Sequence, residues 1–417
     1  MVNLYIFNES NRAAVYGIGT YIKELTAALK ESSVHISIVH LYSEKTDGEL
    51  PESDNVPHIH IPSPVIRNSS LDRQKQNELY YRNIVYLLRL QIKDTENLVF
   101  HLNCNQYGKL AEELKKSFDC CIITTIHYLD WCFSLFGNVT RFKKILSIHE
   151  TDRREDLKEM INESYRKEKY LFKTVDHIIC LSENMRQILQ DAYQIKPDKM
   201  SVIYNGLTDS MCISDNQQVL RQKYHIPDIP VIIFAGRLDE IKGLIYVLQA
   251  FKIVLNTHPH CHFFIVGNGT FDIFMKECEN IWMHVTWTGL VDKEKLYDLY
   301  SIADIGILPS FHEQCSYVAI EMMMHGLPII GSTTTGLKDM IVDGETGLHI
   351  HVIEHDASVE IDVSLLAKKM LYLLQQPEER QRMGANARRR YETVYSAAMF
   401  RKNMLNFYHS LFKQTYP

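Results

Sequence analysis

Short apolar segments alternate with longer amphipathic segments along the whole chain, and this alternation limits the possible folds more than any other feature. The short segments are rich in β-branched and aromatic residues, which predicts strands. The longer segments repeat apolar residues at three- and four-residue spacing, which predicts helices. Strands that alternate with helices along a chain form parallel sheets from βαβ units. We therefore predict an α/β protein.

The predicted strands divide into two sets. In the first half of the chain they lie near 2–7, 34–41, 98–102, 120–126 and 177–181, and in the second half near 231–235, 262–266, 285–288, 305–308 and 328–331. The predicted helices include 20–30, 77–90, 243–257, 293–302 and 363–375. Each half of the chain is then expected to form one doubly wound sheet.

The length of 417 residues, of which 46% are hydrophobic, suits two cores better than one. The weakest periodicity and the most helix-breaking residues fall between Asn205-Gly206 and Pro230. This predicts domains over residues 1–205 and 206–394, followed by a last helix. The segment 151–170 is rich in both charge signs and is most simply a solvent-exposed helix.

The composition excludes several classes of protein. A formal net charge of -6 offers no broad attraction to nucleic acid, so phosphate recognition has to be local. The start of the chain does not resemble a signal peptide, and no apolar segment approaches the roughly 20 residues that span a bilayer. The nine cysteines are scattered and form no Cys-x-x-Cys pair, which is typical of reduced thiols in a cytoplasmic protein.

Polar residues that directly follow a predicted strand are the first candidates for a site, because parallel sheets bind ligands beyond the carboxyl ends of their strands. After residues 231–235 come Gly236, Arg237 and then Lys242, at the start of a helix. Glycine allows close approach of a ligand, and the two cations with the helix N–H groups suit a phosphate. The alternative is a surface turn with two solvated cations.

Two glutamates, Glu313 and Glu321, follow the strand predicted over 305–308. Glu321 lies within a helix whose other side chains are almost all apolar, where a carboxylate loses its hydration unless it accepts strong hydrogen bonds. A ribose diol would be a suitable partner, and a salt bridge to an internal Arg or Lys is the alternative. The amide groups near Ser316, Tyr317 and Val318 begin this helix and could also meet a phosphate.

Other strand ends are less distinctive. His127 directly follows the strand 120–126 and either contacts a sugar hydroxyl or serves as a structural histidine, and His101 presents a weaker case. The turn that contains Gly267 is equally well explained by close packing of a strand and a helix. The segment with Gly17 and Gly19 lacks the third glycine of a dinucleotide fingerprint, so a Rossmann dehydrogenase is poorly supported.

Together these segments, in this order, resemble glycosyltransferase family four, a large family of retaining glycosyltransferases with the GT-B fold. The resemblance spans almost the whole chain and rests on a series of motifs. These are Gly17-Ile18-Gly19, Thr125-Ile126-His127, Asn205-Gly206, Ala235-Gly236-Arg237, Lys242-Gly243, Val266-Gly267-Asn268-Gly269, Gly289, Pro309-Ser310 and the two glutamates.

The resemblance implies two Rossmann-like domains, with the last helix, 395–417, crossing back to the N-terminal acceptor domain. It also implies a role for each candidate residue. Arg237 and Lys242 would hold the donor diphosphate, Glu321 the ribose, and Glu313 with the amides after Cys315 the transferred sugar and its phosphate. Gly17, Gly19, Gly236 and Gly267 would allow close approach to the donor, Leu290 would lie near the base, and His127 would contact the sugar.

The motifs also depart from the commoner family pattern. Gln314-Cys315-Ser316-Tyr317 stands where many relatives have Gly or Pro, Phe, Gly and a small aliphatic residue, and Thr333-Thr334-Thr335-Gly336 replaces a pair of glycines. These departures leave the expected reaction class unchanged. The segment 128–173 is not closely covered by the resemblance.

The expected activity is that of a hexosyltransferase-type glycosyltransferase that uses a UDP- or GDP-linked sugar and an acceptor hydroxyl on a glycan, lipid-linked or peptide acceptor. The sequence has no Asp-x-Asp triplet, so we expect no metal and no cofactor, and cations with helix N-termini would stabilise the leaving group. The alternatives are a non-catalytic sugar-nucleotide-binding protein and a sugar-nucleotide epimerase. The basic segment 141–144 could make a weak peripheral membrane contact, or it is a solvated helix face.

Overall fold

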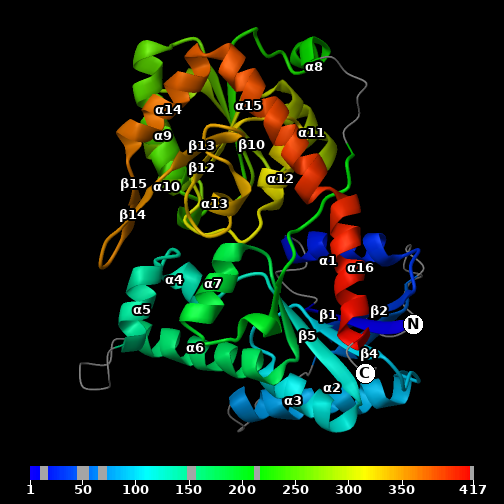
Figure 1. Cartoon of the computed structure of the whole chain (residues 1–417). Coiled ribbons are helices and arrows are strands. Elements are labelled where there is room, and N and C mark those ends of the chain that lie inside the picture. Colours follow the sequence, from blue (N-terminus) through cyan, green and yellow to red (C-terminus); the bar gives the residue numbers. More distant parts are fainter. Residues whose placement is uncertain (10–16, 45–55, 64–72, 148–155, 211–216, 414–417) are drawn as a thin grey trace. The chain divides into compact units, whose positions relative to one another are not determined.

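The computed structural model describes residues 1–9, 17–44, 56–63, 73–147, 156–210 and 217–413. The chain divides into two compact units (Figure 1). Unit 1 comprises Met1–Trp131, Glu150–Gly206 and Ala397–Pro417, and unit 2 comprises Cys132–His149 and Leu207–Ser396. Each unit is built around a parallel sheet with helices on both faces, so the predicted α/β class with two Rossmann-like domains is confirmed.

Unit 1 contains a seven-stranded sheet in the order β3-β2-β1-β4-β5-β6-β7, and all its paired strands are parallel. The strands are β1 (Val2–Glu9), β2 (Val34–Ser43), β3 (His58–Pro62), β4 (Leu98–Leu102), β5 (Cys120–Ile126), β6 (His177–Cys180) and β7 (Met200–Val202). The strand order reverses between β1 and β4, which is where such sheets bind ligands.

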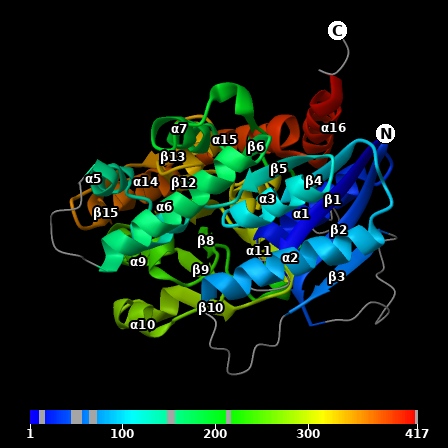
Figure 2. The same cartoon turned by 90° about the horizontal axis from the view of Figure 1, so that it is seen from below.

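Helices cover both faces of this sheet. One face carries α2 (Arg73–Gln91), α3 (Gly108–Ser117) and α6 (Asp156–Thr174), which Figure 2 shows side by side. The other face carries α1 (Gly17–Leu29) and α16 (Ala397–Lys413), which pack against each other (Figure 1). Unit 1 also contains α7 (Glu183–Asp191), whose N-cap Ser182 accepts a hydrogen bond from the Met185 N–H.

Unit 2 contains a six-stranded parallel sheet in the order β10-β9-β8-β11-β12-β13 and a separate antiparallel hairpin, β14-β15. The strands are β8 (Val231–Ala235), β9 (His262–Val266), β10 (Val285–Gly289), β11 (Ile305–Leu308), β12 (Ile329–Ser332), β13 (Gly347–Ile350), β14 (Val352–Glu354) and β15 (Val359–Ile361). The strand order reverses between β8 and β11. The candidate residues Gly236, Arg237 and Lys242 follow β8, and the two glutamates, Glu313 and Glu321, follow β11.

The core of unit 2 lies between its sheet and the helices that follow β8 and β15. Helices α9 (Leu244–Thr257) and α14 (Val363–Gln375) pack together against apolar side chains of β8 and β9 (Figure 1). Each fully buried aliphatic side chain contributes about 1.5–3 kcal/mol to such a core. The other helices are α5 (Val139–Ser147), α8 (Gln217–Lys223), α10 (Asp272–Cys278), α11 (Lys293–Ile302), α12 (Tyr317–Met324), α13 (Leu337–Met340) and α15 (Pro377–Arg390), and α4 (Asp130–Ser134) spans the boundary of the two units.

Two features of the fold differ from expectation. Residues Cys132–His149 group with unit 2, although they lie within the predicted N-terminal domain, 1–205. Helix α6 is not simply solvent-exposed, because Ile161, Glu168, Leu171 and Phe172 are buried, and residues 151–155 lie outside the described part of the chain. In both cases side chains distant in sequence provide contacts that local charge and periodicity do not reveal.

The basic segment 141–144 makes contacts within unit 2. Phe142 is fully buried, Arg141 Nη1 donates to the Ala357 carbonyl at 3.1 Å, and Lys144 Nζ lies 3.0 Å from Asp356 Oδ1. These contacts join α5 to the loop of the β14-β15 hairpin. None of the helices in the described ranges is long and apolar enough to cross a membrane.

Candidate functional site

Three glycine turns lie next to each other at the carboxyl ends of β8, β9 and β10. Gly236 N donates to the Val266 carbonyl at 2.9 Å, and Gly267 N donates to the Gly289 carbonyl at 3.0 Å. Gly267 has φ 143°, and a Cβ atom there would lie 1.8 Å from the Gly236 carbonyl oxygen. Only glycine fits such a close approach of two backbones. Gly267 is therefore constrained by the turn after β8 rather than by a helix.

The two candidate cations that follow β8 have different partners. Lys242 forms an ion pair with Glu313, which follows β11, and both side chains are mostly buried. Arg237 is exposed and lies 2.6 Å from Asp239 Oδ2. The strand reversal thus brings Lys242 and Glu313 into direct contact across 71 residues of sequence. An ion pair this sheltered from water is screened less by salt than a surface pair.

Glu321 lies within α12 and is 7% exposed, as its apolar neighbours in sequence suggest. Its Oε2 accepts from the Tyr300 hydroxyl at 3.4 Å, and its Oε1 lies 3.7 Å from Lys293 Nζ, whose side chain is half exposed. Burial raises the pKa of this carboxyl, and Lys293 opposes the shift. The salt-bridge alternative is therefore present, but only as a long contact to a lysine at the surface.

The first turn of α12 is capped by a side chain. Ser316 is the N-cap, and its hydroxyl accepts from the Ala319 N–H at 3.4 Å. Tyr317 and Val318 are the first two helical residues, so their N–H groups belong to the four that a helix leaves without an internal partner. This end of α12 follows the loop that holds Glu313. The backbone there can accept an anion.

His312 is a candidate that the sequence did not single out. It is 6% exposed, and neither of its ring nitrogens has a hydrogen-bond partner within the described residues. Burial lowers its pKa to about 4, so the ring is neutral near pH 7 and offers one donor and one acceptor. An unsatisfied buried side chain next to Glu313 suits a polar group of a ligand. No sequence signal indicated it, because a histidine in a loop has many possible environments.

In unit 1, His127 follows β5 as predicted and lies beside the end of β4. Its Nε2 is 2.9 Å from Asn103 Oδ1, and the Asn103 amide donates to the Phe7 carbonyl at 3.2 Å. The ring of Tyr21 meets the imidazole at a steep angle, with centroids 4.8 Å apart. Burial lowers the pKa of His127 to about 3, which keeps the ring neutral. Asn103 thus joins the ends of β1, β4 and β5.

His101 is a structural histidine in this fold. It is fully buried in β4, with Nδ1 2.7 Å from the Tyr408 hydroxyl and Nε2 2.7 Å from Thr125 Oγ1. Both nitrogens are therefore satisfied, and the contact with Tyr408 fixes α16 to the sheet. The weaker functional case for His101 finds no support in this arrangement.

The remaining predicted residues lie at the surface or at helix starts. Gly17 and Gly19 lie in the first turn of α1, and a Cβ atom at Gly17 would meet nothing within 4 Å. Leu290 follows β10 and is 77% exposed. Within the residues that the structure describes, no group of three or more His, Cys, Asp or Glu side chains could hold a metal ion.

Comparison with known protein families gives two matches that follow each other along the chain. Residues 15–210 match the model described as Glycosyltransferase Family 4, and residues 216–390 match the model described as Glycosyl transferases group 1. An uncharacterized glycosyltransferase of Methanocaldococcus jannaschii is 26% identical over 260 residues, which are 58% of this chain and 66% of that protein.

Solved structures share the fold at low sequence identity. Sucrose-phosphate synthase from Thermosynechococcus elongatus superposes with a TM-score of 0.76 at 20% identity and full coverage of both chains. The Anabaena protein HepE, solved in complex with UDP, gives a TM-score of 0.72 at 14% identity over 98% of this chain and 100% of its own. The two family matches together cover most of the sequence. This chain therefore belongs to the glycosyltransferases of family four, the group 1 glycosyl transferases, and has their GT-B fold.

Proposed function

We propose that this glycosyltransferase takes its sugar from a nucleoside diphosphate sugar, linked to UDP or GDP, and transfers it to an acceptor hydroxyl. The transfer proceeds with retention of the anomeric configuration and without a metal ion. The observation that carries this proposal is the Lys242–Glu313 ion pair at the strand reversal of unit 2, close in sequence to the start of α12. The complex of HepE with UDP favours UDP as the first nucleotide to test.

The diphosphate is the part of the donor that these residues suit best. Arg237 supplies a planar guanidinium at the surface, and Lys242 supplies a point charge that is held in place by Glu313. The N–H groups at the start of α12 add a positive partial charge. As the bond to the sugar breaks, negative charge develops on the leaving phosphate, and charges fixed beforehand stabilise it without reorganisation.

The pairing with Lys242 supports a positioning role for Glu313. A carboxylate that neutralises a buried lysine is a poor nucleophile, because attack would leave the lysine without its partner. The leaving phosphate itself can accept the proton of the acceptor hydroxyl on the same face of the sugar, which accounts for retention. Glu321 then binds the ribose hydroxyls in place of its long contact to Lys293. His127, neutral at pH 7, binds a sugar hydroxyl.

The test is turnover of UDP-glucose and GDP-mannose, with and without EDTA, with the anomer of the released sugar recorded by NMR before it equilibrates. We expect hydrolysis that EDTA does not affect and that preserves the donor's configuration. Lys242→Ala should lower kcat by about a hundredfold, as for loss of one fixed charge at a developing oxyanion. Lys295→Ala removes an exposed lysine of unit 2 and should leave the rate unchanged.

Other outcomes would assign a different function. Binding of the nucleotide sugar without hydrolysis or transfer to any acceptor would identify a non-catalytic binding protein. Release of a nucleotide sugar with an inverted centre would identify an epimerase. Equal loss of rate in the Lys242→Ala and Lys295→Ala variants would remove the assigned role of Lys242.

A further inference from the structure

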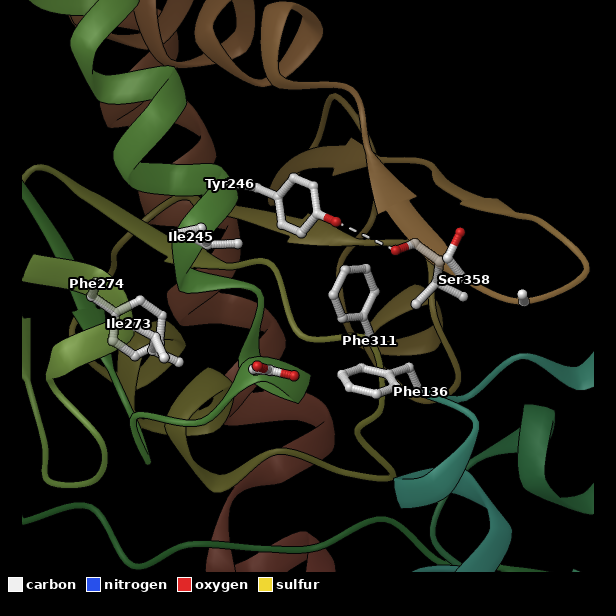
Figure 3. Close-up of a pocket in the computed structure, with 10 residues that line it drawn as sticks. Phe136, Ile245, Tyr246, Ile273, Phe274, Phe311 and Ser358 are labelled. Carbon is white, nitrogen blue, oxygen red and sulfur yellow. Dashed lines mark hydrogen bonds between the residues drawn. The ribbon is translucent and has the colours of Figure 1, made fainter. Parts of the chain in front are cut away.

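Unit 2 contains a pocket of about 310 Å³ whose walls are mostly aromatic and aliphatic (Figure 3). Its volume is at the lower end of the range for small-molecule sites. The rings of Tyr246 and Phe311 meet edge to face at 5.7 Å, and those of Phe136 and Phe311 at 6.1 Å. Figure 3 shows Phe274 on the opposite wall from Phe311 and Phe136. A ligand there would lie between aromatic rings on two sides.

One acidic side chain lines the pocket. Glu240 lines it from the short helical turn Glu240–Lys242, and neither lysine nor arginine is among the described residues that line the pocket. The side chains of Arg141 and Lys144 bind the nearby hairpin loop at Ala357 and Asp356, and neither of them lines the pocket. Aromatic faces together with one carboxylate attract cations and disfavour anions.

One aromatic wall is held in a strained conformation. Phe136 has φ 52°, in the left-handed region that bulky side chains rarely adopt. The next residue, Gly137, packs so closely on Phe311 that a Cβ atom would lie 2.4 Å from the Phe311 carbonyl oxygen. The Asn138 amide donates to the His355 carbonyl at 2.8 Å and so attaches this turn to the β14-β15 hairpin. Backbone strain that is maintained by the surrounding contacts is found most often at ligand sites.

The pocket is separate from the residues assigned to the diphosphate, although it shares two backbone segments with them. The Phe311 N–H donates to the Ile241 carbonyl at 2.8 Å, which joins the β11 loop to the turn after β8. Lys242, two residues after Glu240, directs its ammonium to Glu313 and does not line the pocket. A diphosphate would find no cation among the residues that line this pocket, so the two sites select ligands of opposite charge.

We propose that this pocket binds a small organic ammonium ion, an amine or quaternary ammonium carried on an apolar body. The apolar body lies between Phe274 and the Phe136–Phe311 pair, and the ammonium faces Glu240. This site goes beyond the transfer reaction and does not depend on it.

The first test compares two probes of nearly equal size, phenethylammonium and 2-phenylethanol, whose binding is measured by ligand-observed NMR titration of the full chain. Phenethylammonium should bind about threefold to tenfold more tightly, the range for one cation near aromatic faces and a carboxylate. Glu240→Gln should abolish this preference while 2-phenylethanol binds as before. Equal binding of the two probes to the natural chain, or an unchanged preference in Glu240→Gln, would overturn the proposal.

The second test uses a matched pair of variants. Ile273 lines the pocket and is 40% exposed, whereas Ile253, in the same unit, is 39% exposed and does not line it. Ile273→Lys places a tethered ammonium at the pocket and should weaken phenethylammonium binding at least tenfold, whereas Ile253→Lys should leave it unchanged. Equal effects of the two substitutions, or displacement of the probe by UDP, would show that the probe binds elsewhere.

Discussion

Glu321 combines a buried carboxylate with a weak set of partners, and its titration can be tested directly. Burial raises the pKa of Glu321 in the folded chain, so folding favours the protonated carboxyl. The folded chain therefore loses stability as the pH rises above the pKa that this carboxyl has in the unfolded chain. Glu321→Gln should therefore raise the melting temperature at pH 8 relative to the natural chain, and this gain should shrink towards pH 4. The same variant should bind UDP about tenfold more weakly, because Gln accepts weaker hydrogen bonds from a ribose.

Glu294→Gln is the control for this prediction, since Glu294 is exposed on α11. It should change neither the melting temperature nor the affinity for UDP. A loss of stability in Glu321→Gln at pH 8 would mean that Lys293 and Tyr300 stabilise the carboxylate more than burial destabilises it.

Glu168 is a second buried carboxylate, in unit 1, and it accepts three hydrogen bonds. The donors are the Asp130 N–H at 2.8 Å, the Asn105 amide at 2.9 Å and the Tyr193 hydroxyl. Burial nevertheless raises the pKa of Glu168 from 4.5 to about 8. Its contribution to stability is full below pH 4.5 and is lost as the pH rises through 8. Glu168→Gln, which cannot ionise, should remove this loss.

The measurement is the difference in unfolding free energy between Glu168→Gln and the natural chain at pH 5 and at pH 8.5. We expect this difference to move in favour of the variant by about 1 kcal/mol or more between the two pH values. Buried histidines such as His127 titrate in both proteins and cancel in the difference. Glu163→Gln, an exposed position on the same helix, is the control and should show no such trend. A difference in unfolding free energy that is the same at both pH values would mean that the hydrogen bonds to Glu168 offset the effect of burial on its pKa.

The turns after β8 and β9 depend on one close contact of two backbones. Gly267→Ala would place a Cβ atom 1.8 Å from the Gly236 carbonyl oxygen, so one of the turns has to move. Gly344 also has a positive φ, 74°, but a Cβ atom there meets nothing within 4 Å. We expect Gly344→Ala to cost about 1–2 kcal/mol, the backbone strain alone, and Gly267→Ala to cost clearly more.

The two substitutions should also differ in their effect on the site. Movement of the turn after β8 displaces Arg237, so Gly267→Ala should lose UDP binding at a temperature at which it is still folded. Gly344→Ala should retain binding. Thermal unfolding and a UDP titration of both variants measure the two effects. Equal destabilisation of the two variants would mean that the turn after β8 moves away from the new Cβ atom without any loss of stability.

Across the two units, the sequence predicted the helices and strands whose pattern is local. Strand β8 and helices α11 and α14 have the predicted bounds, because buried β-branched runs and helical periodicity are properties of consecutive residues. The edge strand β3, the short strand β7, the last sheet strand β13 and the β14-β15 hairpin were not predicted. These strands are short, and their pairing depends on neighbours that periodicity does not identify.

In the candidate site, too, the features with a local sequence pattern were predicted and those that depend on distant residues were not. The sequence predicted that Lys242 and Glu313 each follow a strand of the second half of the chain, but not that the two strands are neighbours or that the two side chains form an ion pair. It predicted the burial of Glu321 from the residues around it in the helix, whereas Glu168 is buried among partners such as Asn105 and Tyr193, which lie in turns distant in sequence. Residues Cys132–His149 follow the same rule, since only contacts with distant residues assign them to unit 2.

Amide hydrogen exchange measures how the protection that a bound nucleotide provides is distributed over the chain. A ligand at about 100 times its Kd stabilises the folded form by about 2.7 kcal/mol, so amides that exchange only through unfolding of the binding unit should slow about a hundredfold. With UDP, or with GDP if the base differs, we expect the strongest protection in residues 236–243 and 309–321. Lys242→Ala should reduce the protection of both segments together, because its ammonium joins them through Glu313. Protection confined to unit 1, or equal protection of both segments in Lys242→Ala and the natural chain, would place the diphosphate away from the strand reversal of unit 2.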